Sequence, residues 1–388
     1  MSARANLRGM GLDLSALEAL RAALARVVLP FEAAHMPPRA VYTDPEVHAL
    51  EMAALWRWFA AGSEADLPRA GAWTRVPRVD ASLVLLRGAD GEVRALHDVC
   101  RHRGVQLLDG NEGQLRGAEL LCPYHGWCYG LYGQLLRAPG LIDEEEQRGS
   151  LGLRAAQVWS RWGQLFVAPG TAPGPRERTA GPPWLDELAP LRRARRVRWE
   201  VAANWKLLVE NFQESQHFAG IHPGLEARTP ARESTSVPGE GWLGGTMAIA
   251  EGLETVSVSG RRSGRPWISR PGLRRAVYDA WVAPNLLTSL QPDYLLTYRL
   301  APRAVDRTEV VGEIYVHAEA PADAAALEDI AAFWDRTNAE DRAVCERQQR
   351  GLADRGHEPP RYARGEDGVH MFDVYWASRV LAALQGDG

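Results

Sequence analysis

Two short segments, each carrying one cysteine and one histidine, constrain the fold of this chain more than any other feature. The first has the form Cys100-x-His102 and the second the form Cys122-x2-His125, with 19 residues between His102 and Cys122. Thiolates and imidazoles at such short spacings are typical metal ligands. Because both pairs must reach the same group, the fold has to bring two loops together at one end of a domain.

Two kinds of metal site use this ligand set. A Rieske [2Fe–2S] cluster is held by two cysteines and two histidines, with the histidines on one iron. A structural zinc ion can take the same ligand types, but zinc half-sites usually pair Cys with Cys and His with His. Here each segment carries one of each, and Tyr124 and Trp127 suit a loop packed over a cluster. The pattern favours a Rieske cluster held by these four side chains and leaves the zinc site as the alternative.

The composition indicates a globular protein of two domains. The 388 residues exceed the roughly 100–200 expected of one domain. The net charge of −4 gives no support for a nucleic-acid binder, and no apolar run approaches the roughly 20 residues that span a bilayer. No apolar h-region or small-residue cleavage site follows the N-terminal arginines, so we expect no signal peptide. Only four cysteines occur, which predicts a reducing, cytoplasmic location with Cys128 and Cys345 as buried free thiols.

The first half of the chain changes from helical to β-type patterns. Apolar residues at helical spacing predict one helix from Leu14 to Val28 and a second from Pro45 to Phe59. After Trp73, short β-type runs separated by glycine-rich turns predict a small all-β domain with the two metal-binding loops at one end. The predicted strands are Ser82–Arg87, Val93–Val99, Glu119–Cys122, Leu135–Ala138 and Gln164–Val167.

The second half predicts an α+β domain, an antiparallel sheet with helices on one face. An amphipathic helix is expected from Asn204 to about His217 and a long helix from about Ala322 to Gly351. The strands expected between them are Thr246–Ile249, Ala276–Val282, Leu286–Leu290, Tyr294–Leu300 and Thr308–His317. We therefore assign residues 1–53 to an N-terminal helical segment, 54–170 to the β-domain and 171–388 to the second domain. The Pro/Gly-rich stretch Thr171–Pro183 is the predicted linker.

A basic run follows the linker. It consists of five arginines: Arg192, Arg193, Arg195, Arg196 and Arg198. Such a run usually forms a solvated surface, and we favour this interpretation. The alternative is a docking patch for an acidic electron-transfer partner.

A second group of potential ligands lies in residues 210–223. Glu210, Glu214 and His217 share a face of the expected helix, and His222 follows Gly220, where the helix can break. Two histidines and one carboxylate form the facial triad of a non-haem Fe(II) oxygenase, which leaves positions open for O2. The long helix offers four acids as the third ligand, and spacing alone does not choose among them: Asp335, Glu340, Asp341 and Glu346.

Electrons for such chemistry must come from outside this chain. NAD(P)H delivers electrons in pairs, whereas a [2Fe–2S] cluster passes them singly. No convincing Gly-x-Gly-x-x-Gly fingerprint follows a predicted strand. The expected partner is therefore a separate NAD(P)H-dependent flavin or iron–sulfur reductase, acting directly or through a ferredoxin.

Taken together, these motifs resemble those of the α subunits of the Rieske non-haem iron oxygenases, the ring-hydroxylating oxygenase family. The matching pieces span most of the chain in the family's order: Cys100-x-His102, Cys122-x2-His125-Gly126-Trp127, Asn204-Trp205-Lys206, Glu210-Asn211, Glu214-x2-His217-x4-His222-Pro223, Asn338-x2-Asp341 and Gln349-x-Gly351-Leu352.

The resemblance implies an α+β protein in which an all-β Rieske domain precedes a helix-grip catalytic domain with an antiparallel sheet. It implies that His217, His222 and Asp341 bind a mononuclear Fe(II). It also implies a head-to-tail homotrimer in which Glu214 bridges a cluster histidine of one subunit and an iron-ligating histidine of the next. Asn211 and its neighbour Glu210 are catalytic candidates, although we favour a role in orienting the iron ligands.

The resemblance also suggests a substrate class. Many members carry Asp at position 214, whereas Glu214 resembles the subgroup that oxidises quaternary ammonium compounds such as choline, carnitine and betaines. Two residues depart from the pattern, since Gln216 replaces an aromatic residue common in that subgroup and Cys128 replaces a frequent Thr.

Three functions remain open at this level. The first is a monooxygenase or demethylase of a small quaternary ammonium or N-methyl compound. The second is an arene or natural-product hydroxylase or dioxygenase on the same scaffold, and the third is an electron carrier or zinc-binding protein without oxygen chemistry. The residues expected to line the substrate pocket are Phe212, Phe218, Trp242, Met247, Trp281, Asn285, Leu287 and Tyr298.

Overall fold

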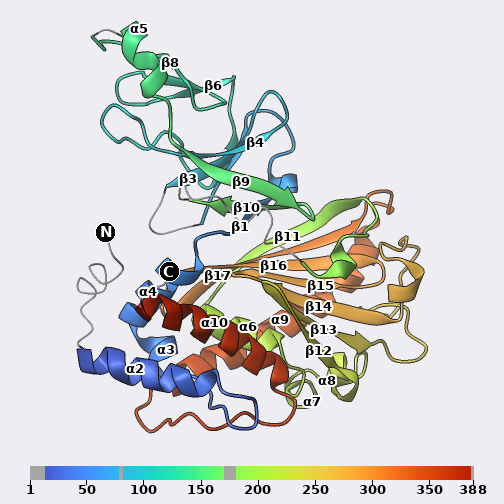
Figure 1. Ribbon diagram of the computed structural model, residues 1–388. Coiled ribbons are helices and arrows are strands. Elements are labelled where there is room, and N and C mark those ends of the chain that lie inside the picture. Colours follow the sequence, from blue (N-terminus) through green and yellow to red (C-terminus); the bar gives the residue numbers. More distant parts are fainter. Residues whose placement is uncertain (1–13, 78–81, 143, 170–180, 386–388) are drawn as a thin grey trace. The chain divides into compact units, whose positions relative to one another are not determined.

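The computed structural model describes residues 14–77, 82–142, 144–169 and 181–385. The chain divides into two compact units, one of residues 57–177 and one that combines residues 1–56 with 178–388 (Figure 1). The N-terminal helices therefore pack in the same unit as the C-terminal half. Most of the predicted linker, residues 170–180, lies outside the described residues.

The unit of residues 57–177 is built from antiparallel β-sheets, which confirms the predicted all-β domain. One sheet has the order β1-β10-β9-β4-β3-β2-β5 and a second, smaller one the order β6-β7-β8. The strands are β1 (Phe59–Ser63), β2 (Ala72–Arg75), β3 (Leu83–Arg87), β4 (Val93–His97), β5 (Glu112–Gln114), β6 (Glu119–Leu121), β7 (Cys128–Gly130), β8 (Leu135–Arg137), β9 (Ala155–Arg161) and β10 (Gln164–Ala168). A short helix, α5 (Glu144–Gln147), follows β8.

One apolar cluster contains side chains from both sheets of this unit. Val84 and Leu86 alternate along β3 and pack in one buried cluster with Trp127 and Tyr129, which flank and enter β7. The same cluster contains Cys100. The cysteine-bearing loops are therefore anchored to the core on which the strands pack.

The second predicted helix is too long. Helix α4 covers Pro45–Leu55, and the next apolar residues, from Phe59, form β1 and pair with β10. Asp44 caps α4 by accepting hydrogen bonds from the backbone N–H groups of Glu46 and Val47. A short apolar run fits a helix and a buried strand equally well, so pairing with β10 decides the outcome.

The other unit contains a seven-stranded antiparallel sheet of order β11-β17-β16-β15-β14-β13-β12. Its strands are β11 (Leu191–Val201), β12 (Thr235–Gly239), β13 (Trp242–Ala248), β14 (Ala276–Val282), β15 (Leu286–Leu290), β16 (Tyr294–Ala304) and β17 (Arg307–His317). Helices lie along one face of this sheet (Figure 1). The predicted α+β architecture with an antiparallel sheet is confirmed.

The helices of this unit come from three parts of the chain. They are α2 (Leu14–Val27), α3 (Ala40–Thr43), α4, α6 (Trp205–Phe212), α7 (Phe218–Ile221), α8 (Pro223–Glu226), α9 (Ala324–Leu352) and α10 (Asp367–Gln385). Single 3-10 turns occur in the two units at Glu64–Asp66, Arg148–Ser150, Pro183–Leu185, Ala231–Glu233 and Pro271–Leu273. The sequence pattern does not predict α10. This helix packs against α2, α4, α6, β12 and β13, so its apolar residues are not confined to one stripe.

The basic run forms the edge strand β11, and much of its charge is neutralised within the unit. Arg193 pairs with Glu313 at 2.6 Å, Arg195 with Asp335 at 2.8 Å, and Arg198 with Glu309 at 3.1 Å. These pairs favour a structural role for the run over a docking patch.

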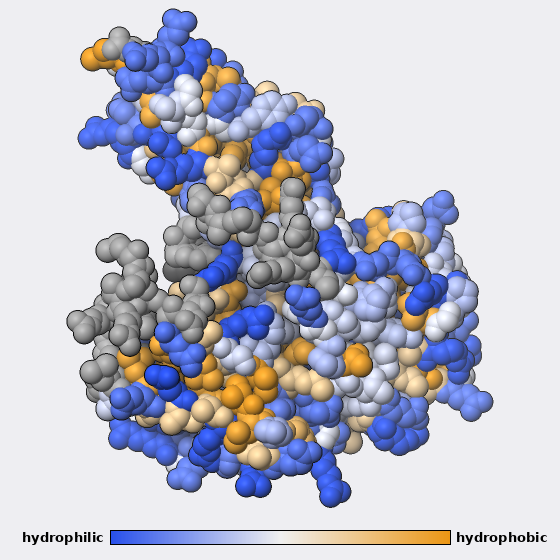
Figure 2. Space-filling view, viewed as in Figure 1, coloured by the Kyte–Doolittle hydropathy of each residue, from blue (hydrophilic) through white to orange (hydrophobic). Residues whose placement is uncertain are grey.

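The visible surface is mostly hydrophilic, with apolar side chains gathered around α10 (Figure 2). Among the described residues, no helix is long and apolar enough to cross a bilayer. All four cysteines are free and buried, including Cys128 and Cys345 as predicted.

Candidate metal centres and the adjoining cavity

The two Cys/His loops of the β unit share one backbone design. In the first, the N–H of Gly104 donates to the carbonyl of Cys100, and in the second the N–H of Gly126 donates to the carbonyl of Cys122. Both glycines have positive φ, +75° and +71°, a conformation that other L-residues rarely adopt. Each loop therefore needs glycine four residues after its cysteine in order to turn the histidine back beside it.

The four candidate ligands are arranged asymmetrically. Cys100 and Cys122 are buried, whereas His102 and His125 are exposed, with ring centroids 4.8 Å apart. The ring of Trp127 stacks on His102 at 4.9 Å, and the hydroxyl of Tyr129 lies 3.3 Å from the Cys100 sulfur. The loops thus present two thiols on the inner side and two imidazoles on the outer side.

This arrangement distinguishes a cluster from a single zinc ion. Zinc ligands lie about 2.0–2.3 Å from the metal, so their donor atoms must converge within about 4–5 Å of one another. Among the described residues, such convergence of three or more ligands is found at His217, His222 and Asp341, and the Cys/His set does not show it. A two-iron cluster separates its thiolates from its imidazoles, and the four side chains fit that group.

The second candidate centre lies in the other unit, where three elements converge. His217 immediately precedes α7, His222 lies between α7 and α8, and Asp341 projects from α9. Asp341 Oδ1 lies 2.7 Å from Nε2 of His222 and 3.5 Å from Nε2 of His217. One ligand atom from each side chain lies within 4.8 Å of the other two. Two imidazoles and a carboxylate gathered on one point fit a mononuclear Fe(II) site.

The local backbone differs from the predicted single helix. Helix α6 ends at Phe212, so Glu214 and His217 do not share a helical face with Glu210. The chain turns instead into the short helix α7, and the break falls at His222 rather than at Gly220. Proline at position 223 accounts for this break, because the residue before a proline is disfavoured in the α conformation.

Both imidazoles are held by carboxylates on the side away from Asp341. Glu214 Oε1 lies 2.5 Å from Nδ1 of His217, and Glu340 Oε2 lies 2.7 Å from Nδ1 of His222. Such contacts fix the tautomer and leave Nε2 free for a metal. The amide nitrogen of Asn211 lies 3.5 Å from Nε2 of His217, within reach of the centre.

The shared protons in this cluster mark a strong cation site. Burial lowers the pKa of His217, but hydrogen bonds to Asp341 and Glu214 outweigh it and raise the pKa to about 9. Burial raises the pKa of Asp341, and its hydrogen bonds to His217 and His222 more than reverse this shift. A bound metal ion would replace these protons.

The four acids that the sequence offered as the third ligand make different tertiary contacts, and these contacts distinguish their roles. Asp335 pairs with Arg195, and Glu346 accepts a hydrogen bond from the backbone N–H of Ala202. Glu340 holds His222 from behind, and Asp341 completes the triad. The positioning role of Glu340 was not predicted, although the residue was among the candidates.

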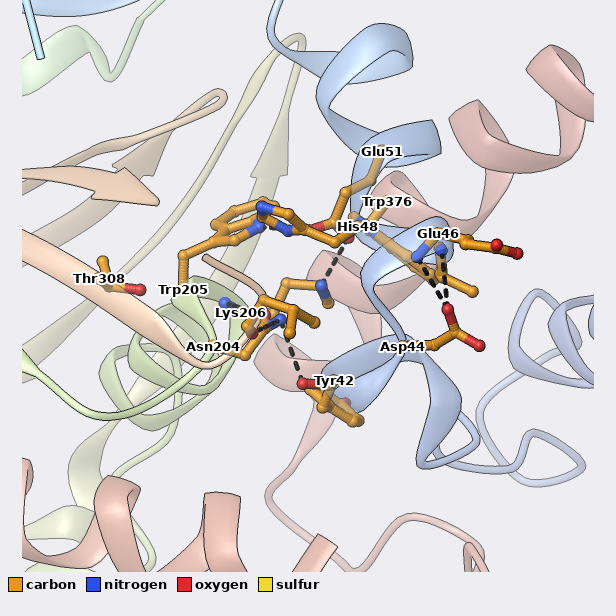
Figure 3. Close-up of polar contacts among 12 residues, drawn as sticks. Tyr42, Asp44, Glu46, His48, Glu51, Asn204, Trp205, Lys206, Thr308 and Trp376 are labelled. Carbon is orange, nitrogen blue, oxygen red and sulfur yellow. Dashed lines mark hydrogen bonds and ion pairs between the residues drawn. The ribbon is translucent and has the colours of Figure 1, made fainter. Parts of the chain in front are cut away.

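A buried polar network holds α6 in place (Figure 3). Lys206 pairs with Glu51 of α4 at 2.5 Å, and the indole nitrogens of Trp205 and Trp376 donate to the same carboxylate at 2.7 and 2.9 Å. Asn204 caps the helix by accepting from the N–H of Lys206. The Asn-Trp-Lys motif therefore positions the helix that leads into the metal ligands. Glu51 was not predicted as part of this network, although a carboxylate among apolar helix residues could have indicated a buried, paired side chain.

The triad lines a small inner cavity of about 60 Å³. Phe212, Phe218, Met247 and Tyr298 line it as predicted, and Trp334 of α9 contributes another ring. Trp242, Trp281, Asn285 and Leu287 do not line it: Trp242, for example, faces the other side of the sheet and packs on Trp184. Alternation along β13 explains this placement, because Met247 and Trp242 point to opposite faces.

A larger outer cavity of about 250 Å³ adjoins the inner one. The residues common to both are Phe212, Glu214, Phe218, Met247 and Asp279. The two cavities therefore meet at these five side chains.

Comparison with protein-family models matches both parts of the chain. Residues 57–144 match the Rieske [2Fe-2S] domain, and residues 188–382 match the ring hydroxylating alpha subunit catalytic domain. Among curated proteins, the chain is 29% identical to the glycine betaine monooxygenase oxygenase subunit of Chromohalobacter salexigens, over 96% of this chain and 92% of that protein. It is 25% identical to the chloroplastic choline monooxygenase of Arabidopsis thaliana, over 89% of this chain and 82% of that protein.

Solved structures show the same fold. A quaternary ammonium Rieske monooxygenase superposes with a TM-score of 0.77 at 20% identity, covering 92% of this chain and 98% of the other. Naphthalene 1,2-dioxygenase from a Rhodococcus species superposes with a TM-score of 0.79 at 20% identity, covering 95% and 99%.

Proposed function

The chain belongs to the ring hydroxylating alpha subunits, with a Rieske [2Fe-2S] domain ahead of its catalytic domain, and from this we propose that it oxidises a small quaternary ammonium or N-methyl compound. It is an oxidoreductase of the Rieske oxygenase type. The observation that carries the proposal is the convergence of His217, His222 and Asp341 on one point at the end of a cavity.

The candidate ligands divide the cofactors between the two units. Cys100, His102, Cys122 and His125 would hold the [2Fe–2S] cluster, and the facial triad would hold the Fe(II). When bound, the cluster supplies electrons one at a time and the iron activates O2.

The surrounding residues prepare the iron site before any substrate arrives. Glu214 and Glu340 hold the Nδ1 atoms of the two imidazoles, so both rings present Nε2 to the same point. Asn211 places an amide beside His217. The aromatic rings of Phe218 and Trp334 line the inner cavity and give it an apolar wall beside the triad.

Glu214 is our candidate for the route of electrons between subunits. His102 and His125 are exposed on the β unit, where a neighbouring subunit can reach them. The Glu214 side chain is 17% exposed and already contacts His217. In a head-to-tail homotrimer, its carboxylate would join a cluster imidazole of one subunit to the iron-bound imidazole of the next.

The family uses a separate reductase and a small-molecule substrate. We propose that an NAD(P)H-dependent flavin or iron–sulfur reductase delivers electrons to the cluster, directly or through a ferredoxin. In the single chain His102 and His125 are exposed. The face that carries them is therefore accessible to such a partner.

The substrate class is proposed from the relatives and from the cavity. Curated relatives that cover most of the chain are glycine betaine and choline monooxygenase subunits. The inner cavity is small, and aromatic rings of the kind that attract a quaternary ammonium line it. The likeness to naphthalene 1,2-dioxygenase shows the fold and does not favour an arene.

The test is NAD(P)H-dependent O2 uptake by the purified protein with a surrogate reductase. Glycine betaine, choline and carnitine are compared with naphthalene and indole, and formaldehyde is measured as the product of oxidative N-demethylation. We expect uptake stimulated by a methylammonium compound, with formaldehyde formed where demethylation occurs. Stimulation by the arenes alone would replace this proposal with arene hydroxylation.

A further inference from the structure

One carboxylate on the inner face of the sheet, that of Asp279, is not balanced by a cation from the described part of the chain. Asp279 lies in β14 between Val277 and Trp281, and side chains two residues apart on a strand share a face. Val277 packs with Phe218 and Met247, and Trp281 packs on Phe372 of α10. Asp279 therefore faces the helices and the cavity, not the outer surface.

The surroundings of Asp279 are polar but uncharged. Its Oδ1 is buried without a hydrogen-bond partner. Ser289, opposite it on β15, accepts from the Gln291 amide at 2.9 Å and turns its own hydroxyl to the carboxylate. Burial raises the pKa of Asp279 to about 7, and the Ser289 hydrogen bond opposes this shift. Among the described residues that line the inner cavity, none is lysine or arginine.

Two fully buried acids of the same unit are balanced by arginines. Asp293 pairs with Arg265 at 2.7 Å, and Glu313 pairs with both Arg193 and Arg299. An isolated buried carboxylate is costly unless it is paired or protonated. Arg232 lines the outer cavity, but it pairs with Glu233. Among the described residues, Asp279 therefore stands out as a cavity carboxylate that no cation contacts.

The position of Asp279 indicates where that counter-ion comes from. Asp279 lines both the outer cavity and the inner cavity that contains the triad. Phe212 and Phe218 line the same two cavities. A ligand that occupies both cavities meets two carboxylates, Glu214 and Asp279, together with these two aromatic rings. Glu214 already contacts Nδ1 of His217, which leaves Asp279 as the carboxylate open to a cationic ligand.

We propose that Asp279 is the counter-ion for the cationic nitrogen of the substrate and so determines the preference for a charged methylammonium head over an uncharged isostere. The carboxylate balances the charge, and the rings of Phe212 and Phe218 contact the methyl groups. This inference rests on the proposed function and names the residue that selects its substrate class.

The experiment measures binding rather than turnover. Calorimetric titrations use the reduced, anaerobic holoenzyme with two matched pairs of ligands: choline against 3,3-dimethylbutan-1-ol, and glycine betaine against 3,3-dimethylbutanoate. Each pair differs in the charge at one atom. The variants are Asp279→Asn, Asp279→Glu and the control Asp306→Asn, which makes the same change at an exposed turn between β16 and β17.

We expect the wild type to prefer the trimethylammonium member of at least one pair by about tenfold or more, since truncating one partner of a buried charge pair costs this much or more. Asp279→Asn should remove most of that preference without weakening the binding of the matching tert-butyl ligand. Asp279→Glu should keep part of it, and Asp306→Asn should match the wild type. Equal binding of both members by the wild type, or an unchanged preference in Asp279→Asn, overturns the inference.

The outcomes also separate this inference from the proposed function. A wild type that demethylates a betaine while Asp279→Asn keeps the full preference leaves the function standing and removes Asp279 from it. A wild type that selects the charged ligand through Asp279 but oxidises only arenes supports the subsite and overturns the proposed function.

Discussion

Glu340 and Asp341, adjacent on α9, contact opposite nitrogens of the same imidazole. Glu340 lies 2.7 Å from Nδ1 of His222, and Asp341 lies 2.7 Å from its Nε2. One helix therefore supplies both a candidate ligand and the group that orients another ligand. Arg336, one turn earlier, contacts the second oxygen of Glu340 at 3.1 Å and steadies it.

Glu340→Gln should weaken iron binding by about 10–100-fold, because partners behind a ligating imidazole contribute this much to metal affinity. The cluster in the other unit should stay fully loaded. Iron retention against a graded chelator measures the first effect, and the visible spectrum measures the second. Glu328→Gln, at an exposed position of the same helix, is the control. Equal iron retention in both variants would show that Glu340 is dispensable.

Glu214→Gln, reconstituted with excess Fe(II) to offset its weaker hold on His217, should carry both metals but transfer electrons from cluster to iron about tenfold or more slowly. Glutamine can still contact Nδ1 of His217, whereas it lacks the negative charge. Rapid mixing of the pre-reduced enzyme with substrate and O2 follows cluster reoxidation in a single turnover. Reoxidation at the wild-type rate in a fully metallated variant would falsify the bridging role.

Lys206→Met should destabilise the catalytic unit by about 3–5 kcal/mol, because it leaves the buried carboxylate of Glu51 without its cation. The double variant Lys206→Met/Glu51→Gln should recover much of this loss, since glutamine keeps an oxygen for the indole N–H groups of Trp205 and Trp376. Urea denaturation followed by tryptophan fluorescence gives the free energy of unfolding. A double variant no more stable than the single one would contradict the explanation.

Asp279 should make stability depend on pH between about 4 and 7. Its pKa is about 7 in the folded protein against an ordinary value of 3.8, so in this range the folded state holds a proton that the unfolded state has lost. The contribution of Asp279 to the free energy of unfolding therefore falls as pH rises from about 4 through 7. Asp279→Asn removes this dependence, and between pH 5 and pH 8 it should gain on the order of 2–3 kcal/mol relative to the wild type.

The pH comparison is made on the protein without substrate, with free energies of unfolding measured at both pH values. Asp306→Asn again serves as the control and should follow the wild type. Parallel pH profiles for Asp279→Asn and the wild type would mean that the carboxyl group titrates normally in the folded protein.

Gly126→Ala should reduce cluster loading, because alanine at a φ of +71° costs about 1–2 kcal/mol in a loop that must position His125. No neighbouring atom lies within 4 Å of an added Cβ at this position, so the cost is one of backbone conformation. Sulfide content and the visible spectrum measure loading. Gly149→Ala, which also meets open space but without positive φ, should load normally.

The sequence alone determined the order of the two domains, the residues of the two Cys/His loops and the pair His217 and His222. These features are local: metal ligands a few residues apart, a glycine that permits a turn, and alternation along β14 and β15, whose predicted bounds match the structure. Local spacing is readable because it depends only on backbone geometry over a few residues.

Spacing alone left four acids of α9 open, and Asp341 was named only through the resemblance to the family; the tertiary structure places Asp341 at the histidines for a physical reason. Only the tertiary structure decided where α6 ends and that Glu51 from the N-terminal helices lies buried against Lys206. It also left Asp279 facing the cavity without a cation. Each of these depends on contacts between segments far apart in the chain, made by packing several elements around one core. The role of an acidic residue depends on whether an arginine, a metal site or a cavity lies beside it in space. These neighbours come from distant segments, so the sequence alone does not show them.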